Sequence, residues 1–210
     1  MLEIINFAYI AVIFVGLTSA LLLMSNSWRL SVIVLAMQYV GVFVLVALSW
    51  PLQMAIVKLV AGWMAGAILG LAQIGSSEQP GSYLRDQSQS GMYTERQPLS
   101  AVLFRFLAAI MVFLAAFSIS PIVLDWIPSV SIEQIIGAFL LISLGLLHLG
   151  FTTEPYRVII GLLTVLAGFE ILYAAVEISA LVAGLLASVN LGLALAGAYL
   201  SIAPGMLEER

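Results

Sequence analysis

The chain has 210 residues, of which 63% are hydrophobic and 9% are charged, and its net charge is −4. A soluble domain is about 45–50% apolar and about 25% charged, so this composition excludes a water-soluble enzyme, a nucleic-acid-binding protein and a disordered chain. The absence of cysteine and the single histidine exclude disulfides, thiolate metal sites and multi-histidine metal or haem sites within the chain. We therefore expect an integral membrane protein without a cofactor. No phosphate-binding loop or nucleophile motif is present, so we expect no catalytic chemistry in this chain itself.

Apolar segments long enough to span a bilayer recur along the chain. A span needs roughly 20 apolar residues to cross a hydrocarbon core of about 30 Å. Seven segments meet this requirement: 4–24, 30–50, 52–74, 101–124, 134–151, 157–178 and 180–202. The last two form one apolar run that is too long for a single span, and we divide it near Ser179. The sequence therefore predicts an all-α membrane bundle of about seven transmembrane helices.

A single long polar stretch, residues 75–100, interrupts this pattern. Its Gly, Ser, Gln and Pro content favours a solvated cytoplasmic loop, and a plain linker is favoured over a docking loop for a soluble partner. This loop divides the chain into an N-terminal three-helix membrane group (1–74), a linking membrane helix with an outer loop (101–130) and a C-terminal three-helix region (131–210).

The cations predict the orientation in the membrane. With seven spans, all arginines fall on one side, whereas the opposite loops contain no Lys or Arg. The positive-inside rule places that side in the cytoplasm, so we expect the N-terminus outside and the C-terminus inside, in the cell (inner) membrane. The arginines are Arg29, Arg85, Arg96, Arg105, Arg157 and Arg210.

Three ionisable residues, Lys58, Glu170 and Glu177, lie within the predicted spans. A charge at mid-membrane costs about 2.5–3.5 kcal/mol on insertion scales, so such residues are candidates for function. At 1.5 Å per residue, Lys58 lies about 10 Å, Glu170 about 13 Å and Asn190 about 15 Å below the outer face. We therefore expect Lys58, Glu170 and Asn190 to share one layer, slightly outward of the midplane.

Glu170, Tyr173 and Glu177 are spaced i, i+3 and i+7, which predicts one helical face. In a low-dielectric interior a carboxyl prefers its neutral form unless it is hydrated or paired. Two carboxyls with a phenol between them can therefore form part of a proton path.

Structural alternatives accompany each of these residues. Glu170 is too deep to reach the interface, and a proton-path role is favoured over a structural ion pair. Simple solvation at the outer interface is favoured for Glu177. Lys58 either reaches the interface or forms a salt bridge with Glu170 or a partner chain. Asn190 is typical of a residue that hydrogen-bonds between helices.

Small residues recur at four-residue spacing in two of the spans. Such stripes allow close helix packing in lipid, and packing within the chain is favoured over a subunit-binding face. The stripes are Gly62, Gly66 and Gly70 in the third span, and Gly184, Ser188, Gly192 and Ala196 in the seventh.

The last three spans, roughly 134–203, resemble the small three-helix membrane subunit of respiratory complex I (its chain 4L or K subunit). The stretch 168–176, Gly-Phe-Glu-Ile-Leu-Tyr-Ala-Ala-Val, is similar to that family's Gly-Leu-Glu-Leu-Met-Leu-Asn-Ala-Val, whose Glu belongs to the proton path. Residues 187–194, Ala-Ser-Val-Asn-Leu-Gly-Leu-Ala, resemble the family's third helix, with Asn190 in the place of a second membrane Glu. Arg157 stands where the family carries basic loop residues.

The whole chain resembles component E of hydrogenase-4-type complexes, which has extra N-terminal spans before a region of this kind. Residues 27–31, Ser-Trp-Arg-Leu-Ser, are similar to its short basic turn, and Lys58 to a lysine on its third span. Related small subunits also occur in multisubunit cation/proton antiporters.

These resemblances imply a membrane subunit of a complex I-related, proton-translocating assembly of hydrogenase or NADH/quinone oxidoreductase type. They imply that Glu170 is the protonatable residue, that Asn190 and Tyr173 orient it or bridge water, and that Lys58 is its charge partner. The expected partners are other membrane subunits and the lipid bilayer, and any redox chemistry belongs to those subunits.

Two alternatives stay open. One is a non-conducting scaffold subunit of such a complex or of a cation/proton antiporter. The other is a self-sufficient small transporter, for which an internal repeat with broken helices is expected and none is evident in the sequence.

Overall fold

The computed structural model describes residues 2–25, 27–77 and 99–208, with side chains for 7–25, 27–75 and 100–203. These residues form seven helices, all long and apolar enough to cross a membrane, so the predicted all-α membrane bundle is confirmed. The helices are α1 (Leu2–Met24), α2 (Trp28–Ala47), α3 (Leu52–Ser77), α5 (Leu99–Trp126), α6 (Ile132–Gly150), α7 (Pro155–Val176) and α8 (Ala180–Glu208).

Most of the predicted loop 75–100 lies outside the described residues. Its two ends were placed wrongly, because residues 75–77 continue α3 and residues 99–100 begin α5. A helix satisfies its own backbone groups, which favours extending it beyond the apolar run wherever no cap or proline stops it.

Local sequence explains several helix ends. Ser131 and Gln134 form a capping box at the start of α6, and Pro155 occupies the first turn of α7. The break predicted near Ser179 is confirmed, since α7 ends at Val176 and α8 begins at Ala180. The hydroxyl of Ser179 accepts a hydrogen bond from the backbone N–H of Val182, at 3.5 Å.

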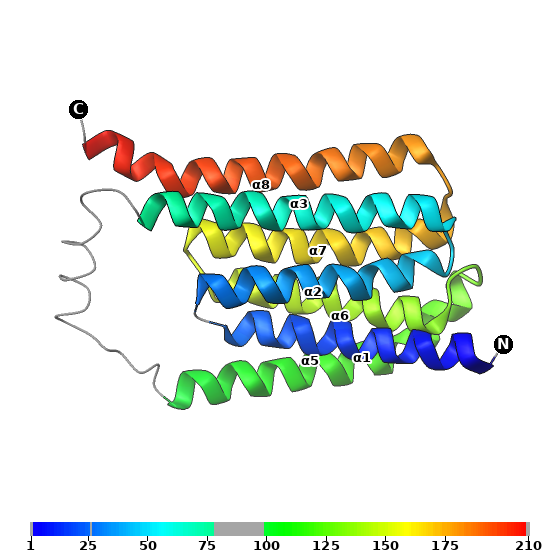
Figure 1. The fold of residues 1–210 in the computed structure, drawn as a ribbon. Coiled ribbons are helices and arrows are strands. Elements are labelled where there is room, and N and C mark those ends of the chain that lie inside the picture. Colours follow the sequence, from blue (N-terminus) through cyan, green and yellow to red (C-terminus); the bar gives the residue numbers. More distant parts are fainter. Residues whose placement is uncertain (1, 26, 78–98, 209–210) are drawn as a thin grey trace.

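The helices lie side by side along one common direction, with α5 and α8 at opposite edges of the bundle (Figure 1). Helices α1, α3, α6 and α8 run one way, and α2, α5 and α7 run the other way. We call the end where α2, α5 and α7 begin the arginine end, because it carries Arg29, Arg105 and Arg157. Six arginines were predicted to lie on one side of the membrane, and these three are confirmed to share one end of the bundle.

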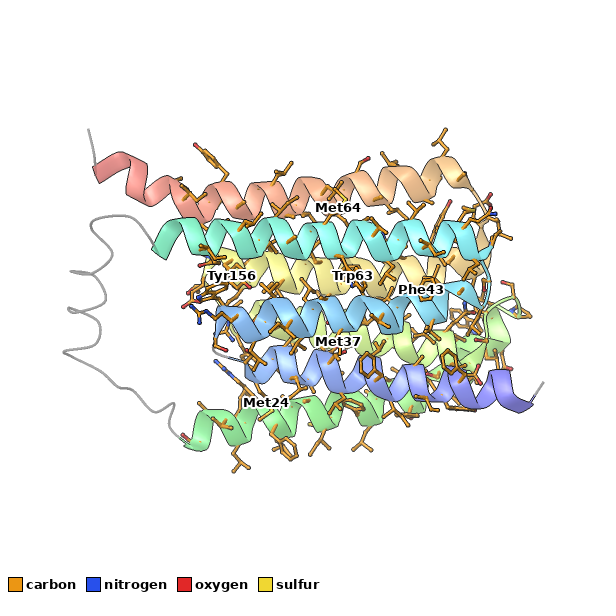
Figure 2. All side chains as sticks on the ribbon, viewed as in Figure 1. Met24, Met37, Phe43, Trp63, Met64 and Tyr156 are labelled. Atoms are coloured by element: carbon orange, nitrogen blue, oxygen red, sulfur yellow. The ribbon has the colours of Figure 1, made fainter. Side chains whose placement is uncertain are left out.

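The first three and last three helices do not form separate bundles. Helix α1 packs on α6, α2 on α7 and α3 on α8, and each of these pairs runs in the same direction. Side chains tie the two groups together at both ends. At the arginine end, where Tyr156 is labelled in Figure 2, this residue donates to the carbonyl of Trp28 at 3.1 Å. Arg157 donates to the carbonyl of Ser25 at 2.6 Å.

The opposite end is fastened by Gln134 and Trp50. The amide nitrogen of Gln134 donates to the carbonyl of Leu45 and to the hydroxyl of Ser49, both at 2.9 Å. The indole of Trp50 donates to the carbonyl of Glu177 at 3.0 Å. Every one of these contacts joins helix α2, or a turn beside it, to the C-terminal half.

The two small-residue stripes have different roles. In α3, Gly62 lies directly against the ring of Tyr39 and Gly70 lies near Val32, so packing within the chain is confirmed at these two positions. Gly66 is buried as well, but a Cβ added there meets nothing within 4 Å. In α8, Gly184, Ser188, Gly192 and Ala196 are exposed, and a Cβ added at Gly184 or Gly192 meets nothing within 4 Å. The packing role predicted for the α8 stripe is therefore wrong within this chain, because α8 turns the stripe away from the bundle.

Gly168 and Gly192 offer a matched test of this packing. A Cβ at Gly168 would lie 2.7 Å from the backbone oxygen of Ala138, which cannot move aside as a side chain can. We expect Gly168→Ala to destabilise the protein by about 1–3 kcal/mol, as overpacking does.

Gly192→Ala serves as the control for that experiment. It fills open space and improves helix propensity, so its stability is expected to be unchanged or slightly higher. Thermal unfolding of the two variants in detergent measures the difference. Equal melting temperatures would contradict the close α6–α7 contact at Gly168.

Candidate functional site

The three polar residues predicted to share a layer meet in the interior of the bundle. Lys58 of α3 forms an ion pair with Oε1 of Glu170 on α7. The side-chain amide of Asn190 on α8 donates to the same oxygen at 3.3 Å. Their exposed fractions are 3%, 1% and 0%, so all three side chains are shielded from lipid. We call these residues the Lys58–Glu170–Asn190 cluster.

Close helix packing brings the three helices of the cluster together. Gly197, two turns along α8 from Asn190, lies against Leu69 of α3 and Ile159 of α7. A Cβ there would lie 2.6 Å from Ile159 and 3.0 Å from Leu69, so only a glycine allows this approach. The triangle of α3, α7 and α8 is narrow enough for their polar side chains to touch.

The structure decides between the alternatives left open for Lys58. Its flexible stem could have carried the ammonium group to the interface, but the side chain is buried and paired with Glu170. Helix α3 turns Lys58 toward the bundle interior, where an unpaired carboxylate would otherwise be costly. The predicted common layer of Lys58, Glu170 and Asn190 is confirmed.

Tyr39 of α2 is a fourth member of this region, and the sequence reasoning missed it. It is 1% exposed, and its ring packs against Gly62, one turn from Lys58. One signal was available. A tyrosine in the middle of a span lies far from the interfacial belt where the residue is usually found.

The hydrogen bonding of the cluster is incomplete. Oε1 of Glu170 accepts from both Lys58 and Asn190, whereas Oε2 is buried and has no partner among the described residues. Oδ1 of Asn190 and the hydroxyl of Tyr39 are also buried without a hydrogen-bond partner among the described residues. A carboxylate can accept about four hydrogen bonds, so Oε2 is free to take a proton or a bond from water.

Glu177 and Tyr173 do not join the cluster. Helix α7 ends at Val176, and Glu177 has an extended backbone (φ −137°, ψ 134°), so it leaves the predicted helical stripe and its side chain is exposed. The ring of Tyr173 is half-buried and stacks on Phe169, with centroids 6.2 Å apart. Their assignment to a proton path stays a prediction.

Within the described part of the chain, no group of three or more His, Cys, Asp or Glu side chains could hold a metal ion. The polar chemistry of the interior therefore rests on the cluster and its neighbours. Comparisons with protein-family models, with curated proteins and with solved structures found no match for this chain.

Removing one charge of the cluster should be far worse than removing both. Lys58→Met leaves the Glu170 carboxylate buried without its counter-charge, which costs about 3–5 kcal/mol for pairs of this kind. In the double variant Lys58→Met/Glu170→Gln no charge remains, so we expect most of that stability to return. Unfolding of both variants in detergent measures the difference.

A simple addition of the two single-variant losses would contradict the ion pair. Glu170→Gln alone provides the third corner of this double-mutant cycle, because it leaves Lys58 without its carboxylate.

Proposed function

We propose that this chain is a membrane subunit of a complex I-related, ion-translocating assembly, in which Glu170 binds and releases a proton. Two kinds of support meet at this residue. Glu170 lies in the stretch that resembles the proton-path helix of the small complex I subunit, and it is the carboxylate of the buried cluster. The protein would lie in the cell (inner) membrane with its arginine end in the cytoplasm.

The open Oε2 of Glu170 is the observation that carries this proposal. A purely structural ion pair is stabilising only when its remaining hydrogen-bonding positions are also filled. Glu170 keeps one oxygen bonded and the other unpartnered within the described protein. A carboxylate held in this way can accept a proton without first breaking its contact with Lys58.

Protonation of Glu170 has a direct electrostatic effect on Lys58. In a low-dielectric interior the attraction between the two charges is much stronger than in water. A proton bound to Oε2 removes the negative charge, so the ammonium group of Lys58 loses its counter-charge. Protonation of Glu170 therefore favours either movement of the Lys58 side chain toward another hydrogen-bond acceptor or transfer of a proton from Lys58 to such an acceptor. Asn190 keeps the carboxyl oriented during this change.

A scaffold subunit is the second candidate function. The exposed small-residue stripe of α8 favours it, because such a stripe allows a neighbouring helix to approach closely. In this case Glu170 and Lys58 only hold α3 and α7 together. A scaffold and a proton-conducting subunit can dock to their partners through the same face of α8.

Glu170→Gln in the assembled complex separates these functions. The amide can still accept from Lys58 and Asn190, but it cannot carry a proton. We expect proton translocation into inverted membrane vesicles to be lost. Because Glu170→Gln leaves Lys58 without its carboxylate, assembly is compared with that of the charge-free variant Lys58→Met/Glu170→Gln, which we expect to assemble and likewise to translocate no protons. Glu154→Gln is the matched control, since Glu154 is exposed at the other end of α7 and makes no side-chain cap bond; translocation should persist.

Normal translocation by an assembled Glu170→Gln complex would establish the scaffold instead. Reconstitution of the purified chain alone in vesicles tests self-sufficient transport, and proton movement without partners would defeat both subunit functions.

A further inference from the structure

Several buried polar atoms have no hydrogen-bond partner among the described residues. Such atoms are rare in folded proteins, because leaving them unpaired costs free energy, and each one needs an explanation. They are Oγ of Ser19, both amide atoms of Gln38, the hydroxyl of Tyr39, Nε2 of His148, Oε2 of Glu170 and Oδ1 of Asn190. These residues come from five different helices, so a local fault in one element does not account for them.

Their heights in the bundle can be compared from one common level. The hydrogen bond between Tyr156 and Trp28 sets the first turns of α7 and α2 side by side at the arginine end. From there, at 1.5 Å per residue, Gly161 lies about 9 Å up α7. His148 packs against Gly161, where an added Cβ would lie 3.3 Å from its ring, so His148 has the same height.

Ser19 and Gln38 lie one level further in. Gln38 is about 15 Å up α2 by the same count. Gly41 of α2 packs against Val15 of α1, and the two helices are antiparallel. One turn toward the arginine end from this contact leads to Gln38 on α2 and to Ser19 on α1, so the two unpartnered side chains share one height.

Tyr39 and the cluster complete the series. Tyr39 follows Gln38 at about 17 Å, and Glu170 lies about 23 Å up α7. The ring of Tyr39 reaches α3 at Gly62, one turn from Lys58. The successive heights of His148, Ser19 and Gln38, Tyr39 and Glu170 therefore differ by about 6 Å or less along the bundle axis, a rise comparable to that of one bridging water with two hydrogen bonds of about 2.8 Å.

We propose that Ser19, Gln38, Tyr39 and His148 line a file of water that leads from the arginine end to Oε2 of Glu170. Buried waters characteristically bond to polar groups that the protein leaves unsatisfied, and a continuous file conducts protons. A hydronium ion at the arginine end transfers its proton to the first water. Each water then passes one on by exchange of O–H bonds, and the last O–H bond forms on Oε2.

The proposed file is one-sided. Beyond Glu170, toward the opposite end, the buried side chains of α7 and α8 are apolar, among them Ile171, Ala174 and Ala183, whereas the first turn of α6 carries the buried Glu133 and Gln134. The polar side chain of Gln134 at that end is hydrogen-bonded. Protons are therefore delivered to Glu170 from the arginine end and need a further event to leave it. This inference rests on the proposed function for its proton but not for its water.

The absence of cysteine allows a direct test, because each single-cysteine variant carries one thiol. Ser19→Cys and Gln38→Cys place that thiol on the file. Val15→Cys and Leu35→Cys, each one turn away on the same helix and equally buried, are the matched controls. The full-length variants are treated with Ag⁺ in sealed membrane vesicles, since this ion follows water files too narrow for organic reagents. The thiols that survive are counted with a maleimide after denaturation.

Two exposed positions identify the side of attack. Glu154→Cys reports access to the arginine end and Asp125→Cys access to the opposite end. We expect loss of the thiols at positions 19 and 38 when Ag⁺ is on the Glu154 side, with the thiols at positions 15 and 35 retained. Retention at 19 and 38, equal loss at the controls, or attack only from the Asp125 side would overturn the water file.

This labelling is independent of proton pumping, so the two proposals fail separately. If Ag⁺ does not react with the thiols at positions 19 and 38, the water file is rejected. If Glu170→Gln also loses translocation, the proposed proton-binding function of Glu170 still stands. If the thiols at positions 19 and 38 react but Glu170→Gln translocates protons normally, the water file stands and its proposed role in delivering protons to Glu170 is rejected.

Discussion

The ion pair between Lys58 and Glu170 is the interaction on which the rest of the bundle depends. Either charge alone would be strongly unfavourable in the hydrocarbon layer, whereas the pair is close to neutral. It also joins residues 112 positions apart, in helices from opposite halves of the chain. The first three helices therefore cannot separate from the last three without leaving two charges uncompensated, which makes one bundle of what the sequence divides into two groups.

The protein contains both complete and incomplete polar contacts, and the contrast between them is informative. Gln134 is buried, caps α6 and donates to Leu45 and Ser49, so its polar atoms serve the packing of helices. Gln38 is equally buried, yet neither of its amide atoms has a partner among the described residues. The packing of the helices gives Gln134 hydrogen-bond partners and does not require a second buried glutamine without any. This contrast supports a hydrated interior around Gln38 and Glu170.

The periphery differs from this interior. Helices α5 and α8 are the least buried of the spans, and they lie at the two edges of the bundle (Figure 1). The outward-facing small residues of α8 lie on the face of this helix opposite to Asn190, which points into the bundle. A neighbouring helix docked on this stripe would therefore be separated from the cluster by α8 itself.

Composition and hydrophobic periodicity determined that this chain crosses a membrane as a bundle of helices, and roughly where each span begins and ends. The lipid solvent allows few other solutions, so local sequence is sufficient for this. Spacing along the helices also placed Lys58, Glu170 and Asn190 in one layer, because depth follows from the rise per residue. Rotation and helix pairing are not encoded locally. Only the tertiary structure decided that Lys58 points inward, that Tyr39 packs on α3 one turn from Lys58, that Glu177 leaves the helix and that the α8 stripe faces outward. Each of these depends on contacts between helices far apart in the chain.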